Sequence, residues 1–91
     1  NPQIKGYRIQ LFFDTDRAAL SDARSIFFAK YPRIDTYATY MAPNFFLRAG
    51  DFRTRLEAEK IKEEINELFP TSFIVSEDVN LPRLEKVRKA P

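Results

Sequence analysis

The stretch that decides the fold runs from residue 44 to residue 59 and reads NFFLRAGDFRTRLEAE. Its first part alternates between two faces in the manner of a β-strand, and a turn is expected at Gly50-Asp51. Thr54 follows, with Glu57 three residues later, and this spacing predicts a capping box at the start of a helix. The stretch therefore predicts a strand that passes through a short turn into a helix.

The first half of the chain repeats the plan of the second half at an offset of 38 residues, so that Tyr31-Pro32 corresponds to Phe69-Pro70. Alternation and helical spacing predict strands at residues 6–13, 36–41, 44–49 and 72–76, and helices at residues 17–30 and 55–68. Two βαβ halves joined by a hairpin give an α+β, ferredoxin-like fold with the order β-α-β-β-α-β. Right-handed crossovers place both helices on one face of a four-stranded antiparallel sheet and leave the other face open.

The chain is expected to form one domain at residues 6–80, with an N-terminal flank at 1–5 and a polar, basic tail at 81–91. The net charge of the 91 residues is +2, but the tail alone contains four basic residues against one acidic residue. The other eighty residues hold 11 basic and 12 acidic side chains, so the domain is close to neutral. We expect residues 77–91 to pack only through Val79, Leu81 and Leu84.

The composition argues against an enzyme. The chain has neither cysteine nor histidine, which excludes a thiol nucleophile, a His-based triad and a zinc site built from these ligands. No glycine-rich phosphate loop or metal-ligand spacing occurs, and we expect no cofactor. Most acidic residues alternate with lysines on the second predicted helix, where they form a solvated surface. The apolar runs are short and broken by charges, so no membrane segment is expected.

The open face of the sheet is the candidate binding surface. The helices are expected to cover the face that carries Ile9, Leu11, Leu47 and Ala49. By alternation the opposite face carries arginines, a glutamine and aromatic residues, a composition typical of a binding surface. Its candidate ligand-binding residues are Arg8, Gln10, Phe12, Tyr37, Phe46, Arg48 and Phe73. The alternative is that the aromatic residues pack under the tail or form a homodimer interface.

Two ligand classes suit such a face. Single-stranded nucleic acid would stack its bases on the aromatic rings. A glycan would lay its sugar rings on the same side chains and form hydrogen bonds with Gln10, while arginines would bind any carboxylate. The near-neutral domain favours the glycan, and residues 45–52 lack the Lys/Arg-Gly-aromatic signature of RNA-recognition modules. We therefore expect no specific nucleic-acid binding.

Several motifs resemble a SPOR domain, the sporulation-related repeat. The family's Arg-x-Gly-x-Phe motif is matched by Arg48, Gly50 and Phe52, and its first-strand Tyr-x-Val-Gln motif is matched at residues 7–10, with Ile9 in place of valine. The sequences of residues 50–59 and 79–84 also resemble those of the SPOR domains found in Bacteroidetes. The resemblance covers residues 6–84. One departure is Phe12-Phe13-Asp14, where the family usually has Gly-Ser-Phe.

The resemblance implies a fold like the one expected above and a non-catalytic function. SPOR domains bind peptidoglycan glycan strands that have lost their stem peptides and so direct proteins to the division septum. The resemblance therefore implies a periplasmic or cell-envelope location within a larger exported protein. It also implies that the lactyl carboxylate of N-acetylmuramic acid is a target for Arg8 or Arg48. A bulky Phe12 would either add a stacking surface or block the groove.

Overall fold

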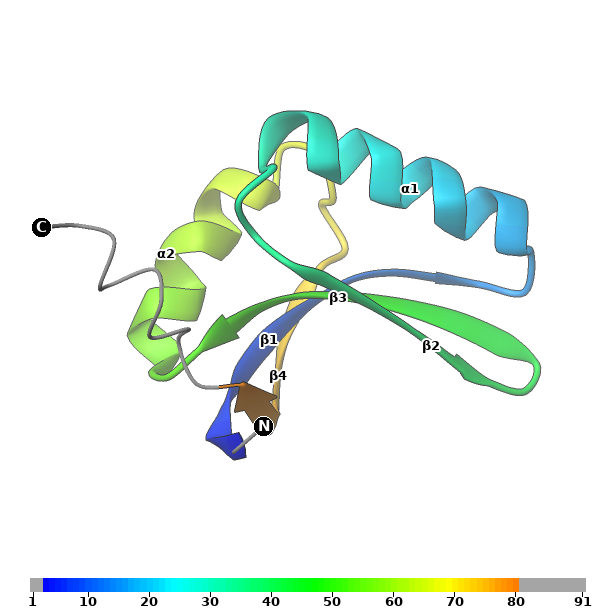
Figure 1. Ribbon diagram of the computed structural model, residues 1–91. Coiled ribbons are helices and arrows are strands. Elements are labelled where there is room, and N and C mark those ends of the chain that lie inside the picture. The colour runs from blue at the N-terminus through cyan, green and yellow to red at the C-terminus, as the bar shows by residue number, and fades with distance from the viewer. Residues whose placement is uncertain (1–2, 81–91) are drawn as a thin grey trace, which may run out of the picture.

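The structure, a computed structural model, describes residues 3–80. It confirms the α+β, ferredoxin-like fold: a four-stranded antiparallel sheet carries two helices and leaves its other face open (Figure 1). The elements follow in the order β1 (Gln3–Asp14), α1 (Arg17–Lys30), β2 (Thr36–Met41), β3 (Asn44–Phe52), α2 (Arg55–Ile65) and β4 (Phe73–Asn80). The strand order is β2-β3-β1-β4, so the first and third strands are central.

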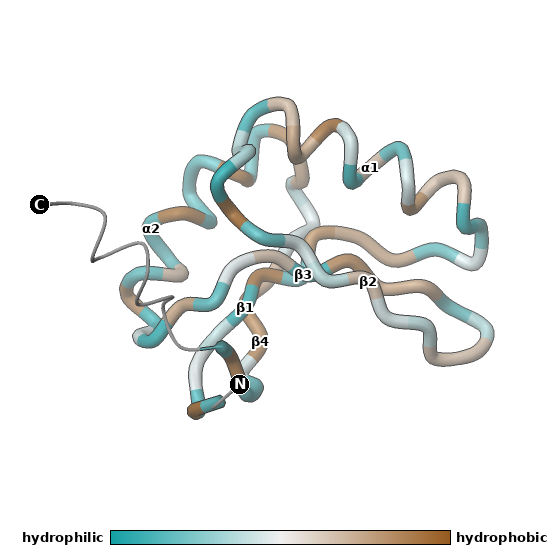
Figure 2. Tube along the Cα trace, in the orientation of Figure 1, coloured by the Kyte–Doolittle hydropathy of each residue, from teal (hydrophilic) through white to brown (hydrophobic). Residues whose placement is uncertain are grey.

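The hydrophobic core lies between the central strands and the two helices. Ile9 and Leu47 are completely buried there, together with Phe27 of α1 and Ile65 of α2. Figure 2 shows the hydrophobic residues along the middle of β1 and β3, while hydrophilic residues recur along both helices. On α1 the buried residues are Leu20, Ala23 and Phe27, whose helical spacing puts them on the side that faces the sheet.

Both helices begin at a side-chain cap, and the cap of α2 is the capping box that the sequence predicts. Asp16 accepts a hydrogen bond from the Ala18 backbone at the start of α1. At α2 the capping box is complete: Thr54 Oγ1 accepts from the Glu57 backbone, and Glu57 accepts from the Thr54 backbone. These bonds satisfy backbone N–H groups that the first turn of a helix leaves unpaired.

Two bulges interrupt the pairing of the central strands. In one, β1 carries an extra residue at Leu11, so that Gln10 pairs with Arg48 but Phe12 pairs with Leu47. The other lies on β3 between Ala49 and Phe52, where Gly50 adopts a φ of 86° that favours glycine. A bulge reverses the alternation of faces beyond it. The two bulges therefore decide which side chains reach the open face.

Four boundaries differ from the sequence prediction by three residues or more. β1 begins at Gln3, inside the predicted flank, and β3 continues through the predicted turn to Phe52. α2 ends at Ile65 because Leu68 and Phe69 donate backbone hydrogen bonds to the Ile65 carbonyl in a closing turn. β4 extends to Asn80, so the prediction that residues 77–80 belong to a loosely packed tail is wrong. The rest of that tail, residues 81–91, lies outside the described residues.

The sheet curls toward its open side at the end where β4 finishes. β1 separates β3 from β4, yet the Asn80 backbone donates a hydrogen bond to Asp51 of β3. Gly6 permits this close approach: a Cβ atom there would lie 2.4 Å from Val79 Cγ2 and 2.5 Å from the Phe52 carbonyl oxygen. Val79 is buried on this side of the sheet. The open face is therefore concave at this end.

Candidate functional site

One row of side chains crosses all four strands on the open face. Gln10 of β1 pairs with Phe73 of β4 on one side and with Arg48 of β3 on the other, and Arg48 pairs with Tyr37 of β2. Paired residues of antiparallel strands point to the same face. The row therefore places four of the predicted site residues side by side, in the order Phe73, Gln10, Arg48, Tyr37.

Arg8 lies beside this row and is nearly buried, with 9% of its surface exposed. Its Nη2 lies 2.8 Å from Asp51 Oδ1, its Nη1 lies 2.5 Å from Glu77 Oε2, and its Nε donates to the Gly50 carbonyl oxygen at 3.3 Å. The guanidinium carbon is also 4.0 Å from the centre of the Tyr37 ring, a cation–π contact. Every nitrogen of the Arg8 guanidinium is therefore engaged within the domain.

Arg48 is linked to the same acidic residue. Its Nη1 lies 2.5 Å from Glu77 Oε1, and its Nε donates to Gln10 Oε1 at 3.1 Å. Glu77 thus bridges Arg8 and Arg48, with one oxygen on each. The two arginines and the two carboxylates of Asp51 and Glu77 balance, so this group of side chains has no net charge.

A second group of polar contacts closes the concave end. The Tyr37 hydroxyl donates a hydrogen bond to Asp51 Oδ2, and Asn80 Nδ2 donates to the Tyr37 hydroxyl at 3.2 Å. The Asn80 backbone donates to Asp51 Oδ1 at 3.0 Å. We call these polar residues of the open face the polar strip: Arg8, Gln10, Tyr37, Arg48, Asp51, Glu77 and Asn80.

Ionisation in the polar strip follows these contacts. Burial alone would raise the pKa of the Asp51 carboxyl, but hydrogen bonds from Tyr37, Arg8 and the Asn80 backbone outweigh it and hold that pKa below its ordinary value. Burial raises the pKa of the Tyr37 hydroxyl, and the bond to Asp51 adds to the effect. Tyr37 therefore remains a donor and Asp51 an acceptor at neutral pH.

The lowered pKa of Asp51 makes stability depend on pH. The folded state binds the proton less tightly than the unfolded chain, so this contribution is complete above the unfolded pKa and is lost as the pH falls through the folded pKa. Asp51→Asn should therefore reduce the loss of stability on acidification. Urea unfolding at about pH 7 and about pH 3 would measure this, with the exposed Asp78→Asn as control. An equal acid sensitivity of Asp51→Asn and the wild type would contradict it.

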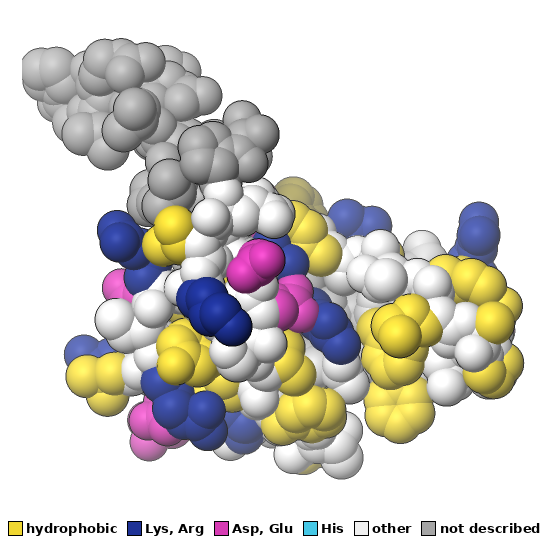
Figure 3. Space-filling model, turned by 90° about the horizontal axis from the view of Figure 1, so that it is seen from below, with side chains coloured by type: hydrophobic (Ala, Val, Ile, Leu, Met, Phe, Trp, Pro, Cys, Tyr) yellow, Lys and Arg dark blue, Asp and Glu magenta, His cyan; other side chains and the backbone are white. Residues whose placement is uncertain are grey.

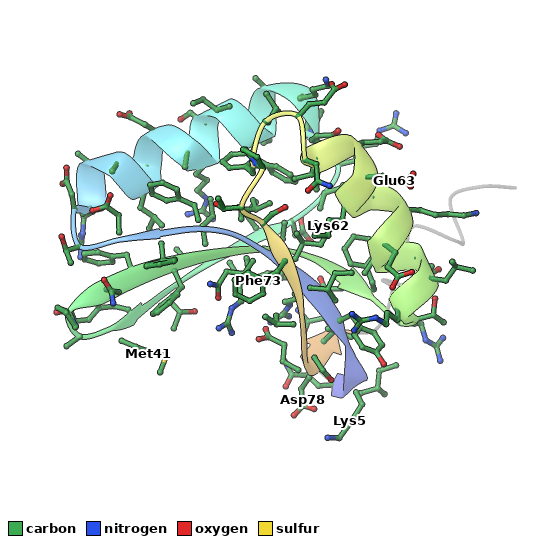
Figure 4. The ribbon with its side chains drawn as sticks, turned by 180° about the vertical axis from the view of Figure 1, so that it is seen from behind. Lys5, Met41, Lys62, Glu63, Phe73 and Asp78 are labelled. Carbon is green, nitrogen blue, oxygen red and sulfur yellow. The ribbon has the colours of Figure 1, made fainter. Side chains whose placement is uncertain are left out.

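Hydrophobic side chains extend the site toward the β2–β3 hairpin. The Phe13 and Phe46 rings stack with centroids 5.9 Å apart and an interplanar angle of 29°. Phe13 is 56% exposed and Phe73 48% exposed, and Met41 is also exposed. Figure 4 shows Met41 and Phe73 on the side of the sheet away from the helices. We call Phe13, Met41, Phe46 and Phe73 the apolar platform.

The polar strip and the apolar platform share the open face. In Figure 3, which views the molecule from this side, acidic and basic side chains lie together in the middle, and hydrophobic side chains gather toward the hairpin end. Arg48 joins the two parts, since its guanidinium carbon is 5.9 Å from the centre of the Phe46 ring. The surface can therefore offer stacking and hydrogen bonds to one extended ligand.

Six of the seven predicted site residues lie on the open face, but the placement of Phe12 there is wrong. The bulge at Leu11 turns Phe12 to the helix side, where it packs against the core and lines a groove of about 390 Å³ with Ala23 and Phe69. Phe13 takes the open-face position instead and pairs with Phe46. A bulky Phe12 therefore neither stacks on a ligand nor blocks the open face.

The sequence prediction lacks five residues of the site: Phe13, Met41, Asp51, Glu77 and Asn80. The sequence predicts Asp51 in a turn and places Glu77 and Asn80 beyond the last predicted strand. Phe13 was not assigned to either face. The one available signal was Gly50: a glycine before a polar residue in a strand indicates a bulge, which would bring Asp51 to the open face.

Comparisons with protein-family models, with curated proteins and with solved structures identified no significant match to this chain. The SPOR resemblance therefore stays a prediction from the motifs. Neither of the two described helices is long and apolar enough to cross a membrane.

Proposed function

We propose that this domain binds a polysaccharide, without catalysis, along the open face of its sheet. The observation that carries the proposal is the row of Phe73, Gln10, Arg48 and Tyr37 across the four strands. Aromatic rings stand at both ends of this row, and planar hydrogen-bonding groups lie between them. Such an arrangement suits a chain of sugars, whose rings stack and whose hydroxyl and N-acetyl groups form hydrogen bonds.

The charge balance favours a sugar over a nucleic acid. A nucleic-acid site usually presents uncompensated lysines and arginines to the phosphates. Here Arg8 is paired with Asp51 and Glu77, and Arg48 is paired with Glu77. Oligonucleotide binding that falls steeply with added salt would point to the nucleic-acid alternative instead.

Within this class, we propose peptidoglycan glycan strands without stem peptides as the ligand. The support comes from the SPOR-like motifs at Tyr7–Gln10 and Arg48–Phe52 and from a fold that such domains share. A stem peptide would clash with the sheet because the row of contacts lies flat across the strands. The domain would then direct its parent protein to the division septum, in the periplasm or cell envelope.

Phe73→Ala should weaken binding at least about fivefold, the loss expected when an exposed aromatic contact is truncated. The measurement is a pull-down on sacculi treated with an amidase, compared with untreated sacculi. Leu56→Ala is the control, because Leu56 is 64% exposed on α2, on the helix side of the sheet. Equal or absent binding of the wild type to both preparations would overturn the proposal.

The apolar platform favours a second candidate, a homodimer through the same face. Phe13, Met41 and Phe73 are exposed apolar side chains on one face, which a second copy of the chain would cover. Sedimentation that depends on protein concentration, without glycan binding, would select this alternative.

A further inference from the structure

Glu77 occupies the position that a ligand carboxylate would take between the two arginines. Its oxygens lie 2.5 Å from Arg8 Nη1 and 2.5 Å from Arg48 Nη1, and its side chain is 23% exposed. Both contacts are short, charge-assisted hydrogen bonds, the strongest kind in proteins. Both arginines that the sequence offers for a ligand carboxylate are thus already paired with a carboxylate of the same chain, and among their guanidinium nitrogens only Arg48 Nη2 forms no hydrogen bond within the described residues.

An external carboxylate would have to displace this internal one. Glu77 is held beside the arginines by the β1–β4 pairing, where it stands opposite Gly6. An intramolecular partner competes at a high effective concentration and loses little freedom on binding, unlike a ligand from solution. Arg8 is also held by Asp51 from the other side, which further limits its movement.

We propose that Glu77 determines the ligand specificity of the open face by excluding carboxylates and selecting uncharged sugar groups. The inference rests on the proposed glycan function and refines it. On a stripped glycan strand, the uncharged N-acetylglucosamine units would contact the row of Gln10 and Arg48. The lactyl carboxylates of the alternate sugars would point away from Glu77.

The experiment measures by NMR titration the association constants of two probes. Chitotetraose is uncharged, and N-acetylmuramic acid carries the carboxylate. The proteins are the wild type, Glu77→Gln and Glu63→Gln. The last is a matched control that removes the same charge from an exposed residue of α2 (Figure 4). Glu77→Gln should raise the association constant for N-acetylmuramic acid at least about tenfold, the factor expected from one charge-assisted hydrogen bond. Chitotetraose binding should change less than about twofold.

The inference is overturned if Glu77→Gln gains no affinity for N-acetylmuramic acid, or if the wild type already binds this sugar more tightly than chitotetraose. Should Glu77→Gln fail to fold, Glu77→Asp replaces it. Aspartate is one methylene shorter and cannot bridge both arginines, so an intermediate gain is expected and no gain overturns the inference. Failure of the proposed function is separate: the wild type would then bind neither chitotetraose nor amidase-treated sacculi.

Discussion

Arg8→Ala should lower the free energy of unfolding by about 3–5 kcal/mol, the usual cost of removing one partner from a buried ion pair. The substitution leaves Asp51 and Glu77 without their shared cation on a largely enclosed part of the sheet. It also removes the cation–π contact to Tyr37. A small domain has a total stability of about 5–15 kcal/mol, so this variant should unfold at a much lower urea concentration.

Arg55→Ala is the control for Arg8→Ala. Arg55 forms an ion pair with Glu59 one helical turn away, at 3.1 Å, but both side chains are more than half exposed. Its removal should cost no more than about 0.5 kcal/mol, as for other exposed pairs on helices. Similar losses for the two arginine variants would show that burial of the Arg8 network contributes little to stability.

Phe27→Ala should be equally severe, with a loss of about 3–5 kcal/mol. Phe27 is completely buried between α1 and the sheet. The centre of its ring lies 5.1 Å from the centre of the Tyr31 ring and 6.3 Å from the centre of the Phe69 ring. The truncation removes these contacts and leaves a cavity that the packed core cannot fill. Chemical denaturation followed by circular dichroism is a suitable measurement.

The next residue in the chain provides the comparison for Phe27→Ala. Phe28 lies on the exposed side of α1, so Phe28→Ala should change the free energy of unfolding by less than about 0.5 kcal/mol. If Phe28→Ala lowered the free energy of unfolding by more than about 2 kcal/mol, the Phe28 ring would have to be buried in solution, contrary to its exposed position on α1.

Most of the fold could be predicted because its signals are local. The capping box at Thr54, the helical spacing of Leu20, Ala23 and Phe27, and the repeat of the aromatic-Pro pair fixed the elements and their order. The end of β4 could not be predicted in this way. Ser76, Glu77 and Asp78 resemble a polar tail, and Glu77 belongs to a strand interior only because two arginines on other strands neutralise it.

The site was predicted less completely than the fold, for a related reason. The alternation of residues along the strands predicts that Arg8, Gln10 and Arg48 lie on the open face. It gives the direction of each side chain but not the residue with which that side chain forms an ion pair or hydrogen bond. The acidic partners come from a bulge at Gly50 and from the last strand, and neither is visible in the alternation. The arginines consequently looked available for a ligand, whereas the structure shows them bound to Asp51 and Glu77.

The two bulges of the central strands shift the register of the β1–β3 pairing by one residue each, in opposite directions. β1 gains a residue at Leu11 and β3 gains one near Gly50, so the shift of register begun at one site is undone at the other. Between them only a short offset block remains, in which Ile9 pairs with Ala49 and Gln10 with Arg48. If one bulge alone were deleted, the register shift at the other bulge would persist to one end of the β1–β3 pairing. Paired deletions should be tolerated better than single ones, so insertions and deletions in these two strands are expected to be inherited together.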